Sequence, residues 1–324
     1  MSHPETLPVA RYRFEIQFNA PLQLNWYGGS MLRGSFGHAL RQISCMTREA
    51  ECDGCLLQQG CPYPHIFQPI ANLATQKSWS GRFGNIPPPY VIEAPLPGMR
   101  YLQPGESLCF NMVLIGQAAI KQLSLLIFAW QRAFQRGITP QRVVGELVRV
   151  SYLAEALEEE GVTLFAPSEG MITLDKPEPP LSAMRPDNER YRSEGGRLSL
   201  LTPLRIKIDG RVQGQELSAE RLLTTLLRRY WLLCQLYGTS PTLEPSFPVR
   251  EEMAKIETVT HLQHYDWCRY SNRQQRRMNL GGMMGEIELR GELGPWYELL
   301  HLGQWLHIGG QTSFGLGGYR LAPL

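Results

Sequence analysis

A basic segment near the carboxyl end of the sequence carries residue types that bind phosphates and bases. Within residues 267–277 the side chains that could contact a nucleic acid are Arg269, Tyr270, Arg273, Arg276 and Arg277. A guanidinium binds phosphate through two parallel hydrogen bonds, and an aromatic ring accepts a stacked base. An arginine run taken alone is more often ordinary solvated surface. The segment is therefore a candidate binding surface that needs a second signal.

A glycine-rich stretch in the same part of the chain supplies that signal. Residues 307–319 read His-Ile-Gly-Gly-Gln-Thr-Ser-Phe-Gly-Leu-Gly-Gly-Tyr, with candidate backbone contacts at Gly309, Gly310, Gly315 and Gly317. Glycines let backbone N–H groups approach a polyanion without hindrance from a Cβ atom. A glycine-rich turn alone commonly marks only a helix end. Because both segments fall in one short region, together they favour RNA binding.

Four cysteines near the amino end have the spacing of metal ligands. The pattern Cys-x6-Cys-x2-Cys-x5-Cys is formed by Cys45, Cys52, Cys55 and Cys61, and Asp53-Gly54 forms a turn dipeptide inside it. Two cysteines two residues apart present both thiolates on one side of a tight turn, which predicts a structural zinc ion. An iron–sulfur cluster or no metal remain alternatives because the outer spacings are unusual. Four thiolates leave no open coordination position, so a catalytic metal is not expected.

Composition places the chain among folded proteins without identifying its ligand. The 324 residues are 43% hydrophobic and 19% charged, and the net charge is only +2. Nucleic-acid binding must therefore come from local basic patches. No apolar run is long enough to span a membrane, and the first residues lack the pattern of a signal peptide. We expect a cytoplasmic protein with no membrane partner, whose thiols stay reduced.

Alternating and helical periodicities predict the same order of elements, β-α-β-β-α-β, in each half of the chain. In the first half these are residues 10–24, 30–43, 90–93, 107–115, 118–136 and 142–153. In the second they are residues 204–212, 219–237, 264–270, 282–293, 295–306 and 315–321. This order matches the ferredoxin-like motif. The sequence predicts an α+β protein with two tandem ferredoxin-like domains.

The boundaries of these domains follow from the position of the prolines. The first domain is expected at residues 1–165, with the cysteine cluster at 45–61 as an insertion, and the second at 200–324 with the glycine-rich loop. Residues 166–199 are rich in proline, a composition typical of a linker or long loop.

Several blocks of the sequence resemble one family. Residues 269–287, 306–317, 32–41 and 201–205, together with Cys52-Asp-Gly-Cys55 and Cys61-Pro-Tyr-Pro, resemble the RAMP-superfamily endoribonucleases that process precursor CRISPR RNA, in a cysteine-bearing branch. The resemblance implies tandem ferredoxin-like domains with the glycine-rich loop close to bound RNA. It also implies cleavage within the CRISPR repeat that requires no metal.

Metal-free RNA cleavage uses the substrate's 2′-OH as nucleophile and needs a base, an acid and a group that stabilises the phosphorane. In this family a histidine often lies on or near the first helix, and here His38 falls within it. Arg41, three residues on, is expected on the same face, and Tyr27 could supply a hydroxyl. The alternative for His38 is a structural histidine satisfied by a backbone carbonyl. His65 and His307 are the reserve candidates.

The predicted function is an endoribonuclease that cleaves precursor CRISPR RNA to mature guide RNA, leaving a 5′-hydroxyl and a 2′,3′-cyclic phosphate. The alternative is a non-catalytic RNA-binding RAMP subunit of a CRISPR effector complex, since fold does not fix activity. The expected partners are repeat RNA, mature guide RNA and other CRISPR effector subunits. A DNA-binding protein is disfavoured because no basic recognition helix follows the cysteines.

Overall fold

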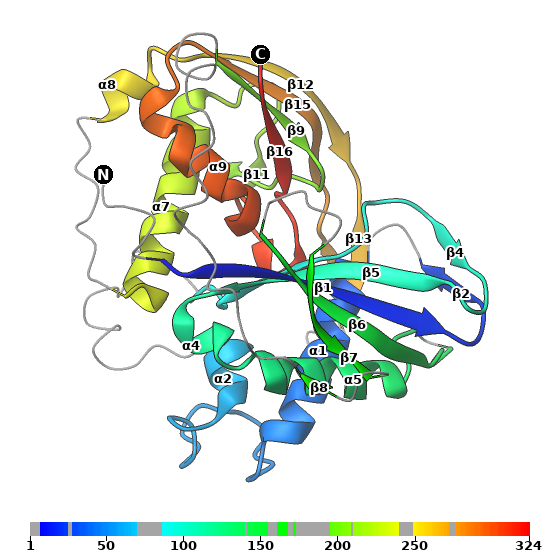
Figure 1. Cartoon of the computed structure of the whole chain (residues 1–324). Helices are drawn as coiled ribbons and strands as arrows, with labels where there is room; N and C mark the ends of the chain where they lie inside the picture. Colours follow the sequence, from blue (N-terminus) through cyan, green and yellow to red (C-terminus); the bar gives the residue numbers. More distant parts are fainter. Residues whose placement is uncertain are drawn as a thin grey trace.

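The computed structural model describes residues 7–24, 28–69, 86–139, 141–154, 161–167, 171–172, 195–208, 210–239, 249–271 and 276–324. Figure 1 shows two αβ units, one built on β1, β5 and β6 and the other on β9, β15 and β16, with helices packed on each sheet. Each unit is a ferredoxin-like domain, so the predicted fold class is confirmed.

The first domain has an antiparallel sheet in the order β3-β5-β1-β6-β7-β8. Its elements are β1 (Val9–Phe18), β2 (Leu22–Leu24), α1 (Gly29–Ser44), α2 (Pro62–Ile66), β3 (Tyr90–Glu93), β4 (Arg100–Leu102), β5 (Ser107–Ile115), α4 (Gln117–Ile120), α5 (Leu123–Gln135), β6 (Gly145–Leu153), β7 (Val162–Ala166) and β8 (Met171–Ile172). The strands β1, β3, β5 and β6 form the ferredoxin-like sheet. The strands β7 and β8 extend it at one edge and were not predicted.

Aromatic side chains fill the space between this sheet and helices α1 and α5. Phe14 of β1 stacks on Phe110 of β5 with ring centroids 5.2 Å apart. Phe36 of α1 stacks on Trp130 of α5 at 5.0 Å. Alternate residues of β1 face this core because side chains alternate along a strand, and the buried stripe of α1 recurs at helical spacing. Core packing thus leaves the opposite faces of α1 and α5 toward solvent.

The second domain repeats the arrangement with the sheet order β12-β15-β9-β16. Its elements are β9 (Gly196–Leu200), β10 (Lys207–Ile208), β11 (Arg211–Val212), α7 (Ala219–Tyr237), α8 (Val249–Met253), β12 (Glu257–Tyr265), β13 (Cys268–Ser271), β14 (Arg276–Asn279), β15 (Gly282–Arg290), η4 (Gly294–Trp296), α9 (Tyr297–Leu306), η5 (Thr312–Phe314) and β16 (Tyr319–Pro323). Helix α7 has the predicted bounds, and the Ser218 hydroxyl accepts a hydrogen bond from the Arg221 backbone N–H at its start.

Three predicted elements of the second domain differ from the structure. The expected strand at 204–212 is wrong, because the first strand of the four-stranded sheet is β9, which lies at the end of the expected linker and ends one residue beyond it. Residues 204–212 instead form two isolated bridges and the small β10–β11 hairpin. The strand expected at 264–270 is β12, which ends at Tyr265, and a separate hairpin, β13–β14, follows it. The last strand begins only at Tyr319.

Helix periodicity alone also predicted one helix of the first domain as longer than it is. The expected helix at 118–136 is divided into α4 and α5, with Lys121 ending the first and Gln122 starting the second. Both segments share an apolar pattern, so the sequence does not reveal the break.

A third apolar cluster joins the two domains. Val9 and Ile115 of the first sheet pack with Leu233 of α7 and with Trp305 and Leu306 of α9. All five side chains are buried. The domains are therefore held together by a continuous apolar contact. None of the helices in the described part of the chain is both long and apolar enough to cross a membrane.

Candidate functional site

The first candidate catalytic residue lies on the exposed face of α1. The side chain of His38 is exposed, while its neighbours Gly37 and Ala39 are buried. Its Nε2 atom lies 3.3 Å from Nη1 of Arg136, which caps the carboxyl end of α5. His38 is therefore not a histidine satisfied by a backbone carbonyl between helix and sheet. An exposed imidazole beside an exposed guanidinium could move a proton next to a bound phosphate.

The second expected catalytic group, Arg41, is engaged away from this point. Arg41 donates from Nη2 to the carbonyl oxygens of Glu49 and, at 2.9 Å, Ala50. Its guanidinium also lies 5.7 Å from the ring centroid of Tyr63. Arg41 thus holds the loop that follows α1. The expected hydroxyl donor, Tyr27, lies outside the described residues.

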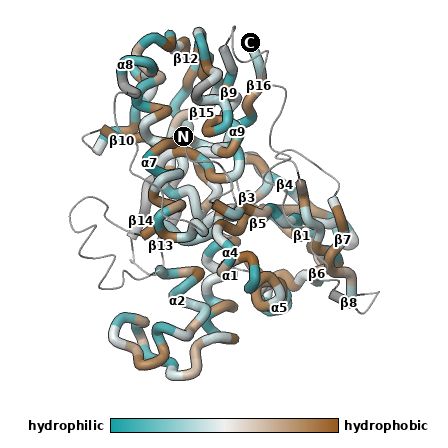
Figure 2. Tube along the Cα trace, turned by 60° about the vertical axis from the view of Figure 1, so that its left-hand side comes forward, coloured by the Kyte–Doolittle hydropathy of each residue, from teal (hydrophilic) through white to brown (hydrophobic). Residues whose placement is uncertain are grey.

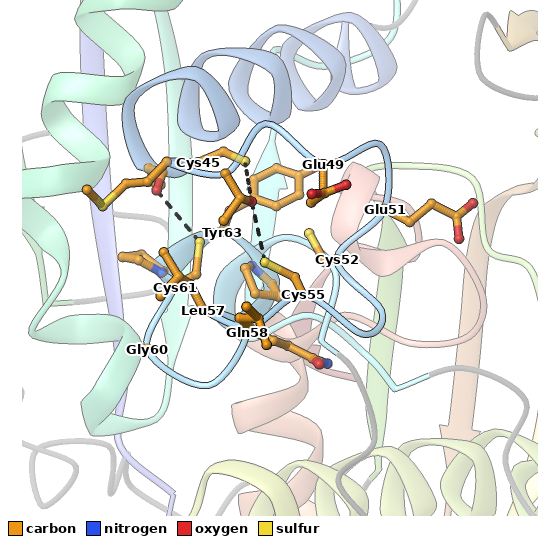
Figure 3. Close-up of a pocket in the computed structure, with 16 residues that line it drawn as sticks. Cys45, Glu49, Glu51, Cys52, Cys55, Leu57, Gln58, Gly60, Cys61 and Tyr63 are labelled. Atoms are coloured by element: carbon orange, nitrogen blue, oxygen red, sulfur yellow. Dashed lines mark hydrogen bonds between the residues drawn. The ribbon is translucent and has the colours of Figure 1, made fainter.

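The four cysteines lie in that loop, between α1 and α2. Figure 3 shows their sulfur atoms turned toward a common space. The Thr47 hydroxyl is 4.0 Å from the Cys45 sulfur and 3.4 Å from the Cys55 sulfur. The Cys61 thiol donates to the carbonyl of Ser44 at 3.7 Å. All four thiols are free and line one hollow.

The charges around this hollow act on its thiols in opposite directions. Burial raises the pKa of Cys52, and the neighbouring thiols Cys45, Cys55 and Cys61 raise it further. The Arg41 guanidinium lowers this pKa, but the net shift is upward. At Cys45, desolvation raises the pKa, but hydrogen bonds from the Arg48 backbone, Thr47 and Arg41 outweigh it, so the net shift is downward. A low thiol pKa favours the thiolate, the form that binds metals. In the described residues, however, no three His, Cys, Asp or Glu side chains are close enough together to hold a metal ion.

The basic segment forms the hairpin β13–β14. Arg269 pairs with Met278 across it, Tyr270 pairs with Arg277, and Ser271 pairs with Arg276. Arg273 lies outside the described residues. At the base of the hairpin, Leu280 is buried in the core of the first domain and Trp267 packs against it. Figure 2 shows the hairpin at the level where the two domains meet. Four of the five predicted RNA-binding side-chain positions therefore lie on one two-stranded element at the domain boundary.

The glycine-rich loop packs tightly against its own domain. The backbone N–H groups of Gly310, Gly315 and Gly317 donate to backbone carbonyls of the second domain. A Cβ atom at Gly317, whose φ is +75°, would overlap the carbonyl oxygen of Ile308, so only glycine fits there. Gly309 is half-buried, and Gly310 with Gln311 forms the exposed rim of the loop. Most of these glycines permit close packing of backbone, and only the rim faces solvent.

One reserve histidine belongs to a buried network between the domains. His307 is 3% exposed, its Nε2 lies 3.3 Å from Oε1 of Glu93, and its Nδ1 lies 3.2 Å from the carbonyl of Leu316. Glu93 also accepts hydrogen bonds from Arg11 at 2.5 Å and from Asn111 at 3.1 Å. Burial alone would raise the pKa of Glu93, but Arg11 and His307 together lower it to about 2. His307 is thus buried and contacts both domains through Glu93 and Leu316.

The other reserve histidine, His65, lies on α2 and is exposed, with Nε2 2.5 Å from the carbonyl oxygen of Gln59.

Sequence reasoning missed Arg136 and the network of Arg11 and Glu93. The sequence signal for Arg136 was its place as a cation at the end of the amphipathic helix α5. That it lies beside His38 of α1 depends on how the two helices pack. For Glu93 the signal was a carboxylate at the end of a strand whose other residues are all buried.

Two family models match this chain, one in each domain. A family model described as the N-terminal domain AF_1859_N matches residues 7–177, more than half of the chain. A second, described as CRISPR-associated endoribonuclease Cas6, matches residues 198–319. No curated protein sequence matches the chain.

Several solved structures share the fold at low identity. A partial Cas6-RT-Cas1–Cas2 complex is 15% identical with a TM-score of 0.57, over 99% of this chain and 47% of that chain. The chain thus spans about half the length of that relative. A Cas6 product complex is 17% identical with a TM-score of 0.53, over 98% of this chain and 99% of that chain. The Cas6 of Thermus thermophilus is 16% identical with a TM-score of 0.50, over 98% of this chain and 99% of that chain.

These structures establish the two-domain fold, and the two family models divide between the two domains. The chain therefore belongs to the family described as the N-terminal domain AF_1859_N, and its second domain, residues 198–319, matches the family described as CRISPR-associated endoribonuclease Cas6.

Proposed function

We propose that this protein cleaves precursor CRISPR RNA within the repeat and releases mature guide RNA. The single observation that carries the proposal is the exposed His38 on the first helix of a Cas6-family fold, with the Arg136 guanidinium 3.3 Å from its Nε2. A titratable group and a cation side by side at the surface suit a reaction in which a proton moves while charge grows on a phosphate.

The proposed reaction needs no metal ion. The 2′-oxygen of the substrate forms a bond to the adjacent phosphorus while the bond from phosphorus to the 5′-oxygen breaks. The 2′-proton leaves to a base, and the departing 5′-oxygen takes a proton from an acid. His38 serves as the base or the acid. The hydroxyl of Tyr27, which precedes α1 by two residues in the sequence, is the proposed second polar donor. The products are a 2′,3′-cyclic phosphate and a 5′-hydroxyl.

The proposed RNA surface is the β13–β14 hairpin with the exposed rim of the glycine-rich loop. Arginines on both strands would pair with phosphates, and Tyr270 would stack on a base. Replacing Arg273, Arg276 and Arg277 together by alanine should weaken RNA binding. The slope of its salt dependence should fall by about one for each phosphate that the variant no longer binds. Affinity that stays unchanged across a salt series would show that the run is solvated surface.

Cleavage of repeat RNA in EDTA tests the reaction. His38→Ala should lower the single-turnover rate by about 10²–10⁴-fold while RNA binding survives, because the change removes a proton carrier. A substrate with deoxyribose at the scissile nucleotide should bind and remain uncut. If the deoxy substrate is cut, attack by the 2′-OH is wrong.

The alternative, a non-catalytic RNA-binding subunit, is the conclusion if the wild-type protein binds repeat RNA without cutting it. We also propose partners among CRISPR proteins. The support is the Cas6-RT-Cas1–Cas2 complex, in which one chain of about twice this length contains the matching fold. Co-purification of this chain with its neighbouring CRISPR proteins tests the association.

We propose, in addition, that the cysteine loop binds one structural zinc ion. Support comes from the ligand spacing and from the four thiols that line one hollow beside Arg41. Small movements of an exposed loop would be needed to bring the sulfur atoms together. The zinc would fix the loop against α1 and supply no chemistry.

A further inference from the structure

We infer that Arg136 is a catalytic residue whose guanidinium contacts a non-bridging oxygen of the scissile phosphate and orients the imidazole of His38. The inference rests on the proposed function, because it assigns the phosphorane-stabilising group of that same reaction. The expected group, Arg41, is engaged by loop carbonyls.

The contact between the two side chains fixes the role of each nitrogen. A guanidinium can only donate hydrogen bonds, so Nε2 of His38, 3.3 Å from Nη1 of Arg136, must be the acceptor. The imidazole proton is then on Nδ1, and the lone pair of Nε2 accepts the Arg136 N–H. This is the form in which a histidine removes a proton from a hydroxyl. Arg136 thus prepares His38 to act as the base.

The rest of the Arg136 guanidinium is available to a ligand. Within the described ranges, no carboxylate or carbonyl of the protein accepts a hydrogen bond from it, and its side chain is exposed. Other arginines nearby are used differently. Arg132 lies over the ring of Phe128 with its Cζ 5.0 Å from the centroid. Arg33 lies between the rings of Phe67 and Phe314 at 4.4 and 4.6 Å. Arg136 therefore has donors left over for a phosphate.

Binding of the RNA would exchange one hydrogen bond for others. When the 2′-OH reaches Nε2, it takes the place of the Arg136 N–H at that nitrogen. The guanidinium can then donate to a non-bridging phosphate oxygen. As the 2′-oxygen bonds to phosphorus, its proton passes to Nε2. The bond from phosphorus to the 5′-oxygen breaks, and that oxygen takes a proton from a water molecule. The negative charge that grows on the phosphorane lies against Arg136. This negative charge also offsets the repulsion between the new imidazolium and the guanidinium.

The test is single-turnover cleavage of repeat RNA by enzyme in excess, with Arg136→Ala, Arg136→Lys and, as matched control on the same helix, Arg132→Ala. Loss of one charge-stabilising donor should slow Arg136→Ala by about 10²–10³-fold. Arg136→Lys keeps the charge but not the forked donor geometry and should recover part of that loss. Arg132→Ala should stay within about twofold of wild type, as surface substitutions usually do.

A sulfur substitution separates contact with the phosphate from a merely structural role. A phosphorothioate replaces one non-bridging oxygen of the scissile phosphate by sulfur. The wild type should cut one of the two diastereomers more slowly than the all-oxygen substrate. Arg136→Ala should cut that diastereomer no more slowly than it cuts the all-oxygen substrate. An Arg136→Ala rate equal to wild type overturns the inference, as does an equal sulfur effect in both proteins. If Arg136→Ala does not fold, Arg136→Gln, which keeps much of the side chain's length but not its charge, is tested with the sulfur substrates and gives the same decision.

His38→Ala in the same assay distinguishes failure of this inference from failure of the proposed function. If His38→Ala cleaves slowly while Arg136→Ala cleaves as fast as wild type, only the inferred role of Arg136 is wrong. A His38→Ala variant as active as wild type removes the proposed active site itself.

Discussion

Replacing Glu93 by glutamine should loosen the contact between the two domains. Glu93 of the first domain lies 2.5 Å from the Arg11 guanidinium and 3.3 Å from Nε2 of His307 in the second domain. Arg11 also lies over the ring of Trp305, with its Cζ 5.5 Å from the centroid. Glutamine keeps the shape but removes the charge, so Arg11 is left buried without its counter-ion.

The pKa of Glu93 gives the size of the effect. Burial raises this pKa, but Arg11 and His307 outweigh burial and lower it from 4.5 to about 2. Because a tenfold change in an ionisation constant corresponds to about 1.4 kcal/mol, the ionised carboxylate contributes about 3 kcal/mol to stability at neutral pH. This agrees with the ~3–5 kcal/mol usually lost when one partner of a buried ion pair is removed.

Urea unfolding at several pH values measures this contribution. The pKa of Glu93 is lower in the folded state, so its contribution is fully present above about pH 4.5 and is lost as the pH falls toward 2. Wild type and Glu93→Gln should therefore differ by about 3 kcal/mol at pH 7 and converge in acid.

The matched control is Glu15→Gln, whose partner Arg149 is 55% exposed at 3.1 Å. Such a surface pair should contribute about 0–1 kcal/mol. A Glu93→Gln variant that loses no more stability than this control at pH 7 would refute the reasoning.

Two further substitutions address the loops. Cys52→Ser should lower the melting temperature and release one equivalent of zinc, and metal analysis of the wild type that finds neither zinc nor iron would contradict the metal site. Gly317→Ala should destabilise the protein by about 2 kcal/mol or more, because φ is +75° and the added Cβ meets the Ile308 carbonyl. Gly310→Ala, at the exposed rim with no positive φ, should be nearly neutral in the same thermal melt.

The regular elements with strong periodicity could be predicted from the sequence. The bounds of α7, β3 and β5 agree with the structure, and α1 differs by one residue at each end. Each of these segments carries an uninterrupted apolar pattern, since core burial repeats at the period of its own backbone. The segment 204–212 has the same alternation but contributes no strand to the four-stranded sheet of the second domain. Its buried Arg205 pairs with Gly309 of the glycine-rich loop, a contact distant in the sequence.

The sequence by itself determined which chemistry the chain carries: a histidine on its first helix, arginines around a tyrosine, four cysteines and a glycine-rich loop. Only the tertiary structure decided which of these groups meet. The packing of α5 on α1 places Arg136 beside His38, the docking of the domains buries His307 on Glu93, and the loop after α1 takes up Arg41. Residue type and spacing determine what a local segment can do, whereas pairings between distant segments depend on how whole faces pack, and that is not encoded at any fixed spacing.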